Sequence, residues 1–216
     1  MKSCIKQSVT FTILMISALT ASAAWKTQTC QDGRTVAIVP GGGGYCGIDG
    51  RTVSIPSGWS KKQGSDGRLI AVPPRGVAME GKDHRMVAVP DGWIYVEGFD
   101  GHIVAIPPEG TVAEGFDHRS IAVPKGWRQV EGKDGRMVAV PPEGTAFAGP
   151  DGRTIAKPKD WVAIVGNDNR AVAIPPGGEY VMSRDQHIVT LPPDNFDMSD
   201  YITLYCILGV QGVQTE

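Results

Sequence analysis

The sequence predicts an all-β repeat protein built from short β-hairpin units. Three observations predict this class: a motif that recurs every 17 residues, apolar residues at alternate positions, and turn residues at fixed places between them. Glycine and proline together make up about a fifth of the 216 residues, which indicates many turns. After the first residues, no window has the sustained spacing of an amphipathic helix.

The repeat is defined by an aspartate, taken as position 1 of each 17-residue copy. It recurs ten times without an insertion or a deletion, at Asp32, Asp49, Asp66, Asp83, Asp100, Asp117, Asp134, Asp151, Asp168 and Asp185. Position 2 is mostly Gly, His or Asn, which tolerate positive φ, and position 16 is Gly in eight of ten copies. The sequence therefore predicts a tight hairpin turn at each aspartate, whose carboxylate accepts hydrogen bonds from amides of the turn.

The strands are predicted from positions 5 and 7, which are Val, Ile or Leu in nearly every copy, with a small residue between them. The small residue indicates close packing on the second face as well. Proline fills position 8 in nine copies and should end the strand, because it cannot donate to a β ladder. A three-residue loop at positions 17, 1 and 2 would place position 14 opposite 5 and position 12 opposite 7, so that apolar residues face each other.

The connections between these units alternate along the chain. Copies two, four, six and eight carry a tryptophan at position 11, whereas copies three, five, seven and nine read Pro-Pro-x-Gly, so the full period is 34 residues. Two architectures fit ten such units: a small five-bladed propeller with four strands in each blade, or an open β-solenoid or stack of hairpins. The sequence leaves both open.

The ends of the chain differ from the repeats. Residues 1–23 are expected to be a signal peptide, because Lys2 and Lys6 precede an apolar stretch that ends in Ala21-Ser22-Ala23. Residues 24–31 would be a lead-in, 32–200 the ten-repeat β domain, and 201–216 a capping strand and tail. We therefore expect a secreted, periplasmic or cell-surface protein with no transmembrane span in the mature chain.

The charge and the cysteine content limit the classes of partner and the cellular compartment that the sequence favours. Loss of residues 1–23 would leave 19 basic and 23 acidic residues without a basic cluster, which argues against nucleic acid as a partner. The remaining cysteines are Cys30, Cys46 and Cys206, and export favours a disulfide among them. A bridge from Cys30 to Cys206 and one from Cys30 to Cys46 both agree with the sequence.

No catalytic or metal site is predicted. The recurrent Asp and Arg residues are interpreted as turn formers and strand partners, because ten equivalent positions do not make one active site. A nucleophile–base pair, a phosphate-binding loop and a calcium loop do not stand out, so no cofactor is expected. The candidate ligand-binding residues are aromatic, and they are Trp59, Trp93, Trp127, Trp161 and Tyr95.

The tryptophans suggest a function because aromatic rings at equivalent points of successive units suit stacking against sugar rings. The competing interpretation is that each tryptophan covers the end of a hairpin. The leading hypothesis is an exported, non-catalytic repeat protein that presents a binding surface to glycans or to a cell-surface partner. The alternatives are a structural, envelope or assembly component and, third, an enzyme whose site the sequence does not reveal. The sequence does not indicate an oligomeric state.

Overall fold

The computed structural model describes residues 24–193, and this part of the chain contains twenty β-strands. The predicted signal peptide, the predicted capping strand and Cys206 lie outside the described residues. The odd-numbered strands are β1 (Lys26–Thr29), β3 (Gly43–Cys46), β5 (Ser60–Gln63), β7 (Val77–Glu80), β9 (Ile94–Glu97), β11 (Thr111–Glu114), β13 (Arg128–Glu131), β15 (Thr145–Ala148), β17 (Val162–Val165) and β19 (Glu179–Met182). The even-numbered strands are β2 (Thr35–Ile38), β4 (Thr52–Ile55), β6 (Leu69–Val72), β8 (Met86–Val89), β10 (Ile103–Ile106), β12 (Ser120–Val123), β14 (Met137–Val140), β16 (Thr154–Lys157), β18 (Ala171–Ile174) and β20 (Ile188–Leu191).

Each odd-numbered strand pairs with the next strand in an antiparallel hairpin, which gives ten separate two-stranded sheets. Val96 lies opposite Val104 and Ile94 opposite Ile106, and the other hairpins have the same register. The predicted pairing of position 14 with 5 and of position 12 with 7 is therefore confirmed. β1 lies within the lead-in, residues 24–31, and forms the first hairpin with β2.

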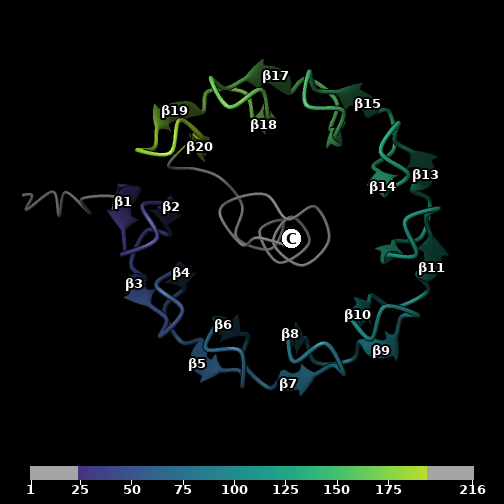
Figure 1. The fold of residues 1–216 in the computed structure, drawn as a ribbon, viewed down its shortest axis with the longest axis horizontal. Helices are drawn as coiled ribbons and strands as arrows, with labels where there is room; N and C mark the ends of the chain where they lie inside the picture. Colours follow the sequence, from purple (N-terminus) through teal and green to yellow (C-terminus); the bar gives the residue numbers. More distant parts are fainter. Residues whose placement is uncertain (1–23, 194–216) are drawn as a thin grey trace, which may run out of the picture.

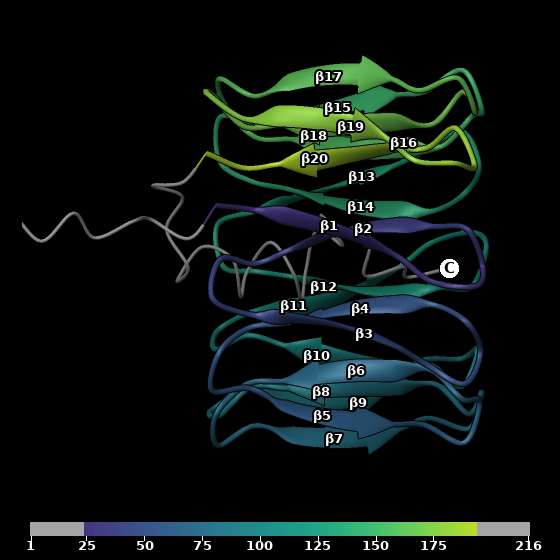
Figure 2. The ribbon, with the colours of Figure 1, turned by 90° about the vertical axis from the view of Figure 1, so that its left-hand side faces the viewer.

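The hairpins follow one another around a ring (Figure 1). The even-numbered strands face the centre and the odd-numbered strands form the outer wall. The strands run along the axis of the ring, so the turns gather at its two ends (Figure 2). Each inner strand contacts the inner strand of the next hairpin, and β20 contacts β2, so the last hairpin is a neighbour of the first.

The predicted all-β hairpin repeat is thus confirmed, but its hairpins do not merge into four-stranded blades. Among residues 24–193 every sheet has two strands. The cause is the connection between hairpins, in which the N–H of Gly76 donates to the carbonyl of Pro73 and Arg75 has a φ of 61°. This is the geometry of a type II turn, and such turns splay the flanking strands instead of pairing them.

The hydrophobic core lies between adjacent hairpins. Ala122, at position 6 on β12, packs against Val104 and Ile106 of the preceding inner strand, at positions 5 and 7. Ala139 on β14 packs in the same way against Val123. The alanine at position 6 therefore packs against the larger side chains of the previous hairpin. This close packing explains why a small residue lies between the branched residues at positions 5 and 7.

A disulfide joins Cys30 to Cys46 and decides between the two pairings that the sequence left open. Cys30 follows β1 and Cys46 ends β3, so the bridge connects the outer strands of the first two hairpins. In the chain-entropy model, closing a loop of this size stabilises the folded protein by about 3 kcal/mol.

Candidate functional site

The aspartates at position 1 hold the hairpin turns. In all ten copies the Oδ1 atom accepts a hydrogen bond from the backbone N–H of position 3, as Asp83 does from Arg85 at 3.1 Å. The residue between them has a positive φ in every copy, including His84 and His118 at 64° and 62°. These two predictions for the turn are confirmed, and each aspartate has a structural partner.

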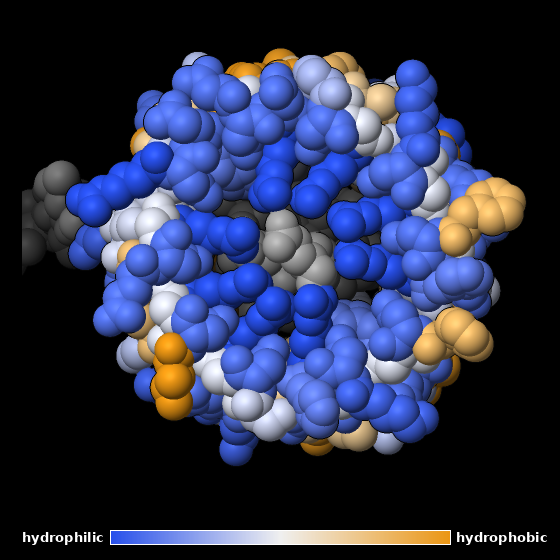
Figure 3. Space-filling view, in the orientation of Figure 1, coloured by the Kyte–Doolittle hydropathy of each residue, from blue (hydrophilic) through white to orange (hydrophobic). Residues whose placement is uncertain are grey.

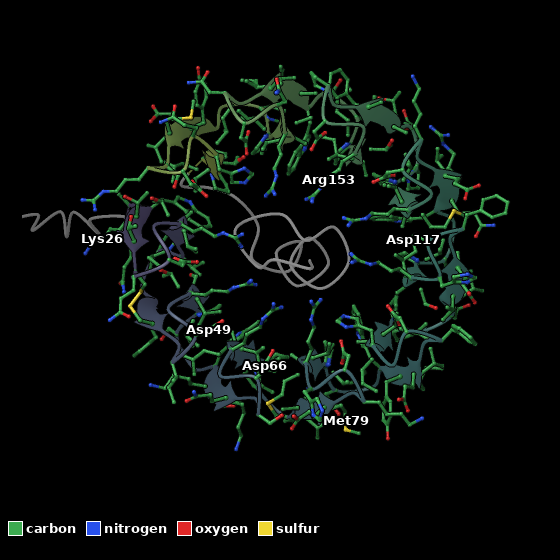
Figure 4. The ribbon with its side chains drawn as sticks, in the orientation of Figure 1. Lys26, Asp49, Asp66, Met79, Asp117 and Arg153 are labelled. Atoms are coloured by element: carbon green, nitrogen blue, oxygen red, sulfur yellow. A yellow bond between two sulfur atoms is a disulfide. The ribbon has the colours of Figure 1, made fainter. Side chains whose placement is uncertain are left out.

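What we call the aspartate belt consists of the aspartates at position 1 and the side chains at position 3. The eight arginines place Nε 3.3–3.9 Å from the aspartate of their own turn. Some also reach the preceding copy: Arg136 Nε lies 3.6 Å from Asp117, and His102 Nδ1 lies 2.8 Å from Asp83. Nitrogen-bearing side chains, Arg153 among them, point towards the centre of the ring (Figure 4).

Electrostatics within the belt are those of a paired network. Burial lowers the pKa of the Arg68 guanidinium, and the neighbouring Arg51 and Arg85 lower it further against the opposing effect of Asp66 and Asp49. Burial raises the pKa of the Asp83 carboxyl, but hydrogen bonds from the His102 side chain and the Arg85 backbone, with the charges of both residues, bring it below its ordinary value. The same contacts recur around the ring, so the belt offers a repeated structural network and no distinctive acid–base pair.

The four tryptophans occupy equivalent places at the opposite end of the hairpins. Each backbone N–H donates to the carbonyl of the proline three residues earlier, as Trp93 does to Pro90 at 3.1 Å. All four side chains are half-buried. Trp59 packs against the cluster that contains Val53 and Ile55, and Trp127 packs against the one that contains Val123. This packing favours the interpretation that these side chains cover hairpin ends.

The structure does not bring the tryptophans together. They precede β5, β9, β13 and β17, which are spread around the ring (Figure 1). Sugar binding by Trp59, Trp93, Trp127 and Trp161 would thus have to use separate places. Tyr95, the fifth candidate, lies on outer strand β9 and is about half exposed.

Tyr95 belongs to a surface that sequence reasoning did not find, which we call the apolar sector. It covers three consecutive hairpins, from β7 to β12, and holds six of the twelve exposed large hydrophobic side chains in residues 24–193: Val77, Ile94, Tyr95, Phe99, Val112 and Phe116. Ile94 is 64% exposed, Phe99 83% and Phe116 82%. Apolar side chains protrude from the edge of an otherwise largely hydrophilic ring (Figure 3).

The two phenylalanines occupy position 17, at the tips of two adjacent turns, where the other copies carry no aromatic residue. The ring of Phe99 contacts that of His118, with centroids 5.6 Å apart, and so joins the two tips. The signal that could have revealed the sector is therefore departure from the repeat. Positions that hold the fold are nearly constant, whereas positions 12, 13 and 17 vary and lie outside.

A row of glutamates borders the sector, and we call it the acidic row. It consists of position 15 in four consecutive outer strands: Glu80, Glu97, Glu114 and Glu131. Position 15 carries no acid in the six other outer strands, β1, β3, β5, β15, β17 and β19. Apolar and acidic side chains thus coincide on one side of the ring.

Comparison of the chain with protein-family models, with curated proteins and with solved structures gave no match. In residues 24–193, no helix has the length and apolar character needed to cross a membrane. In the same range, no three His, Cys, Asp or Glu side chains are grouped so that they could hold a metal ion. Function is therefore argued from the geometry of the surface.

Proposed function

We propose that this protein is an exported, non-catalytic binding protein that engages its partner through the apolar sector. The observation that carries the proposal is that three neighbouring hairpins hold six exposed large hydrophobic side chains, among them Phe99 and Phe116, together with most of the acidic row. The hairpins of β17 and β19 carry four exposed large hydrophobic side chains but no phenylalanine among them and no acid at position 15. Contiguous exposed apolar surface is costly in water and marks interaction sites. The repeat supplies a rigid frame, and the residues that depart from it supply the specificity.

The non-catalytic part of the proposal is supported by the belt. Its aspartates and arginines make the same contacts in successive turns, so their chemistry is used for the fold. Export is supported by the Cys30–Cys46 disulfide, because such bonds persist mainly in oxidising compartments. The partner classes are those expected from the sequence, a cell-surface protein or a glycan, and exposed Tyr95 beside half-buried Trp93 is where a sugar would stack.

We further propose that the hairpins act as two-stranded blades of a closed, propeller-like ring. Contact of β20 with β2 supports closure. Small-angle X-ray scattering from the mature protein tests this, because a closed ring scatters as a compact disc and an open stack scatters as a rod. A rod-like profile would contradict closure.

The binding proposal is tested with two matched double variants. The sector variant carries Ile94→Ser and Phe99→Ser, and the control carries Val162→Ser and Tyr180→Ser on the far side of the ring, where the wild-type residues are 59% and 50% exposed. Each protein is cross-linked to cell-surface fractions, and any captured protein is purified and tested again. A glycan array is probed in parallel.

We expect the wild type and the control to bind the same partner, and the sector variant to lose about tenfold or more in affinity. Equal binding by all three proteins would contradict the proposal. Sedimentation velocity separates the assembly alternative: self-association that only the sector variant loses would show that the surface joins copies of this chain.

A further inference from the structure

We propose that the partner of the apolar sector is a basic polypeptide segment that binds in an extended conformation along the outer edge of β9. The inference rests on the proposed function and names the chemistry of the partner. Three independent features of the same side of the ring lead to it: the apolar side chains, the acidic row and the open edge of the strand.

The apolar side chains set the direction of the binding site. Ile94 and Tyr95 lie on β9 and Phe99 lies in the turn that follows, so they are spaced along the strand axis. Val77 and Val112 lie on the neighbouring outer strands β7 and β11. A segment running parallel to β9 would place its own apolar side chains against Ile94, Tyr95 and Phe99.

The acidic row sets the charge of the partner. Glu97 pairs with Lys82 at 3.2 Å, and Glu114 lies 3.4 Å from His118. The Lys82 side chain is 83% exposed and that of His118 is 69% exposed, so these pairs are weak and easily exchanged. Cationic side chains of a partner would complement the row, whereas an anionic lipid surface would meet like charge from the glutamates.

The edge of β9 provides the main-chain contacts. Among residues 24–193, β9 has a ladder partner on one side only, β10. An exposed sheet edge accepts an additional strand through main-chain hydrogen bonds, and neighbouring side chains give specificity. The other outer strands also have an open edge, but they do not combine it with the exposed apolar side chains and the acidic row found at β9. For example, β5 reads Ser-Lys-Lys-Gln and is polar and basic.

The inference is tested by displaying random peptides to the immobilised mature protein. Selections against the wild type, the sector variant and the Val162→Ser, Tyr180→Ser control run in parallel. We expect the wild type and the control to enrich peptides in which Lys or Arg alternates with Ile, Val, Phe or Tyr. The sector variant should not enrich them.

One enriched peptide is then synthesised and its affinity measured. The Glu97→Gln, Glu114→Gln double variant, which keeps the apolar side chains, should weaken binding about fivefold to tenfold, because two exposed carboxylates are lost. Raising the salt concentration from about 0.05 M to about 0.5 M should weaken wild-type binding and leave the binding of this variant less affected. Amides of residues 94–97 should exchange more slowly in the complex.

Backbone methylation tests the strand addition. Two peptides are N-methylated at the odd and at the even residues, so that each loses the main-chain donors of one edge and keeps its charge. The peptide methylated on the edge that faces β9 should no longer bind, and the other should bind as before. Unchanged affinity of both peptides would overturn the edge-pairing part of the inference.

The outcomes also separate the inference from the function on which it rests. Enriched peptides without basic residues that still need Ile94 and Phe99 would overturn the basic partner and keep the sector as a binding site. Failure to enrich any peptide would overturn the inference, while the cross-linking experiment decides the function independently. Flotation with phosphatidylglycerol–phosphatidylcholine vesicles that requires Phe99 would replace the polypeptide by a lipid surface.

Discussion

The hydroxyl of Ser183 accepts a hydrogen bond from the backbone N–H of Thr35 at 3.1 Å and donates one to the carbonyl of Gly33 at 3.3 Å. These residues belong to the last and the first hairpin, so one buried side chain joins the two ends of the repeat. Eight copies carry glycine at the position of Ser183. The serine therefore departs from the repeat at the contact between the last hairpin and the first.

Replacement of Ser183 should weaken this junction. Ser183→Ala removes both hydrogen bonds to half-buried backbone groups, so we expect a loss of about 1–3 kcal/mol in the free energy of unfolding, from about 0.5–1.5 kcal/mol for each bond. Urea denaturation followed by circular dichroism measures it. Ser57→Ala, at an exposed turn position, is the control and should be close to neutral. Equal stability of the two variants would show that the hydroxyl does not support closure.

Ser54 compensates for an irregularity in the first copy. Val39 occupies the place where the nine other copies have proline, and its buried N–H donates to Ser54 Oγ at 3.1 Å. Ser54→Ala should therefore lower the free energy of unfolding by about 1–3 kcal/mol, because it leaves the buried N–H of Val39 without a hydrogen-bond acceptor. In a Val39→Pro background there is no N–H to satisfy, and the same substitution should cost little.

A double-mutant cycle of Val39→Pro and Ser54→Ala measures that coupling. We expect an interaction energy of about 1 kcal/mol or more between the two positions. Additive effects would mean that the serine stabilises the protein through other contacts.

Asp160 stands in a turn position that favours glycine. Its φ is 63°, and the equivalent residues Gly58, Gly92 and Gly126 have φ values of 77–79°. Asp160→Gly should stabilise the protein by up to about 1 kcal/mol, because a side chain in the left-handed region carries a steric cost. Thermal and urea unfolding measure the change.

The reverse substitution, Gly92→Ala, is the matched control. A Cβ at Gly92 would meet nothing within 4 Å, so the substitution tests the backbone alone and should destabilise by about 1 kcal/mol. If neither substitution alters the unfolding free energy, conformational strain does not operate in these turns.

Acid should remove the contribution of Asp83 to stability. The pKa of this carboxyl is lowered in the folded protein, so the unfolded state takes up its proton at a higher pH than the folded state does. The contribution is present above the unfolded value, about 4, and is lost as the pH falls through the lower folded value. Urea unfolding of the wild type and Asp83→Asn between about pH 7 and about pH 3 should show the difference between them shrinking as the pH falls. A difference that stays constant over this range would contradict the assignment.

The turns and hairpins could be predicted from the sequence because their causes are local. Asp83, His84 and Arg85 contain the chemistry of one turn, and the alternation of apolar residues on either side sets the register. The candidate site could be predicted only in part. Tyr95 was identified as an aromatic residue, but the neighbours that make it part of a surface lie 17 or more residues away along the chain.

The sequence by itself determined the class of the fold, the number of hairpins, their register and the turn at each aspartate. Tertiary structure decided that the sheets have two strands, that the last hairpin lies beside the first, that Cys30 joins Cys46, and that half of the exposed large apolar side chains lie on three neighbouring hairpins. The physical reason is that these features depend on how one hairpin packs on the next. That packing is set by contacts between neighbouring hairpins, such as Ala122 against Val104, and it places Ser183 of the last hairpin beside Thr35 of the first.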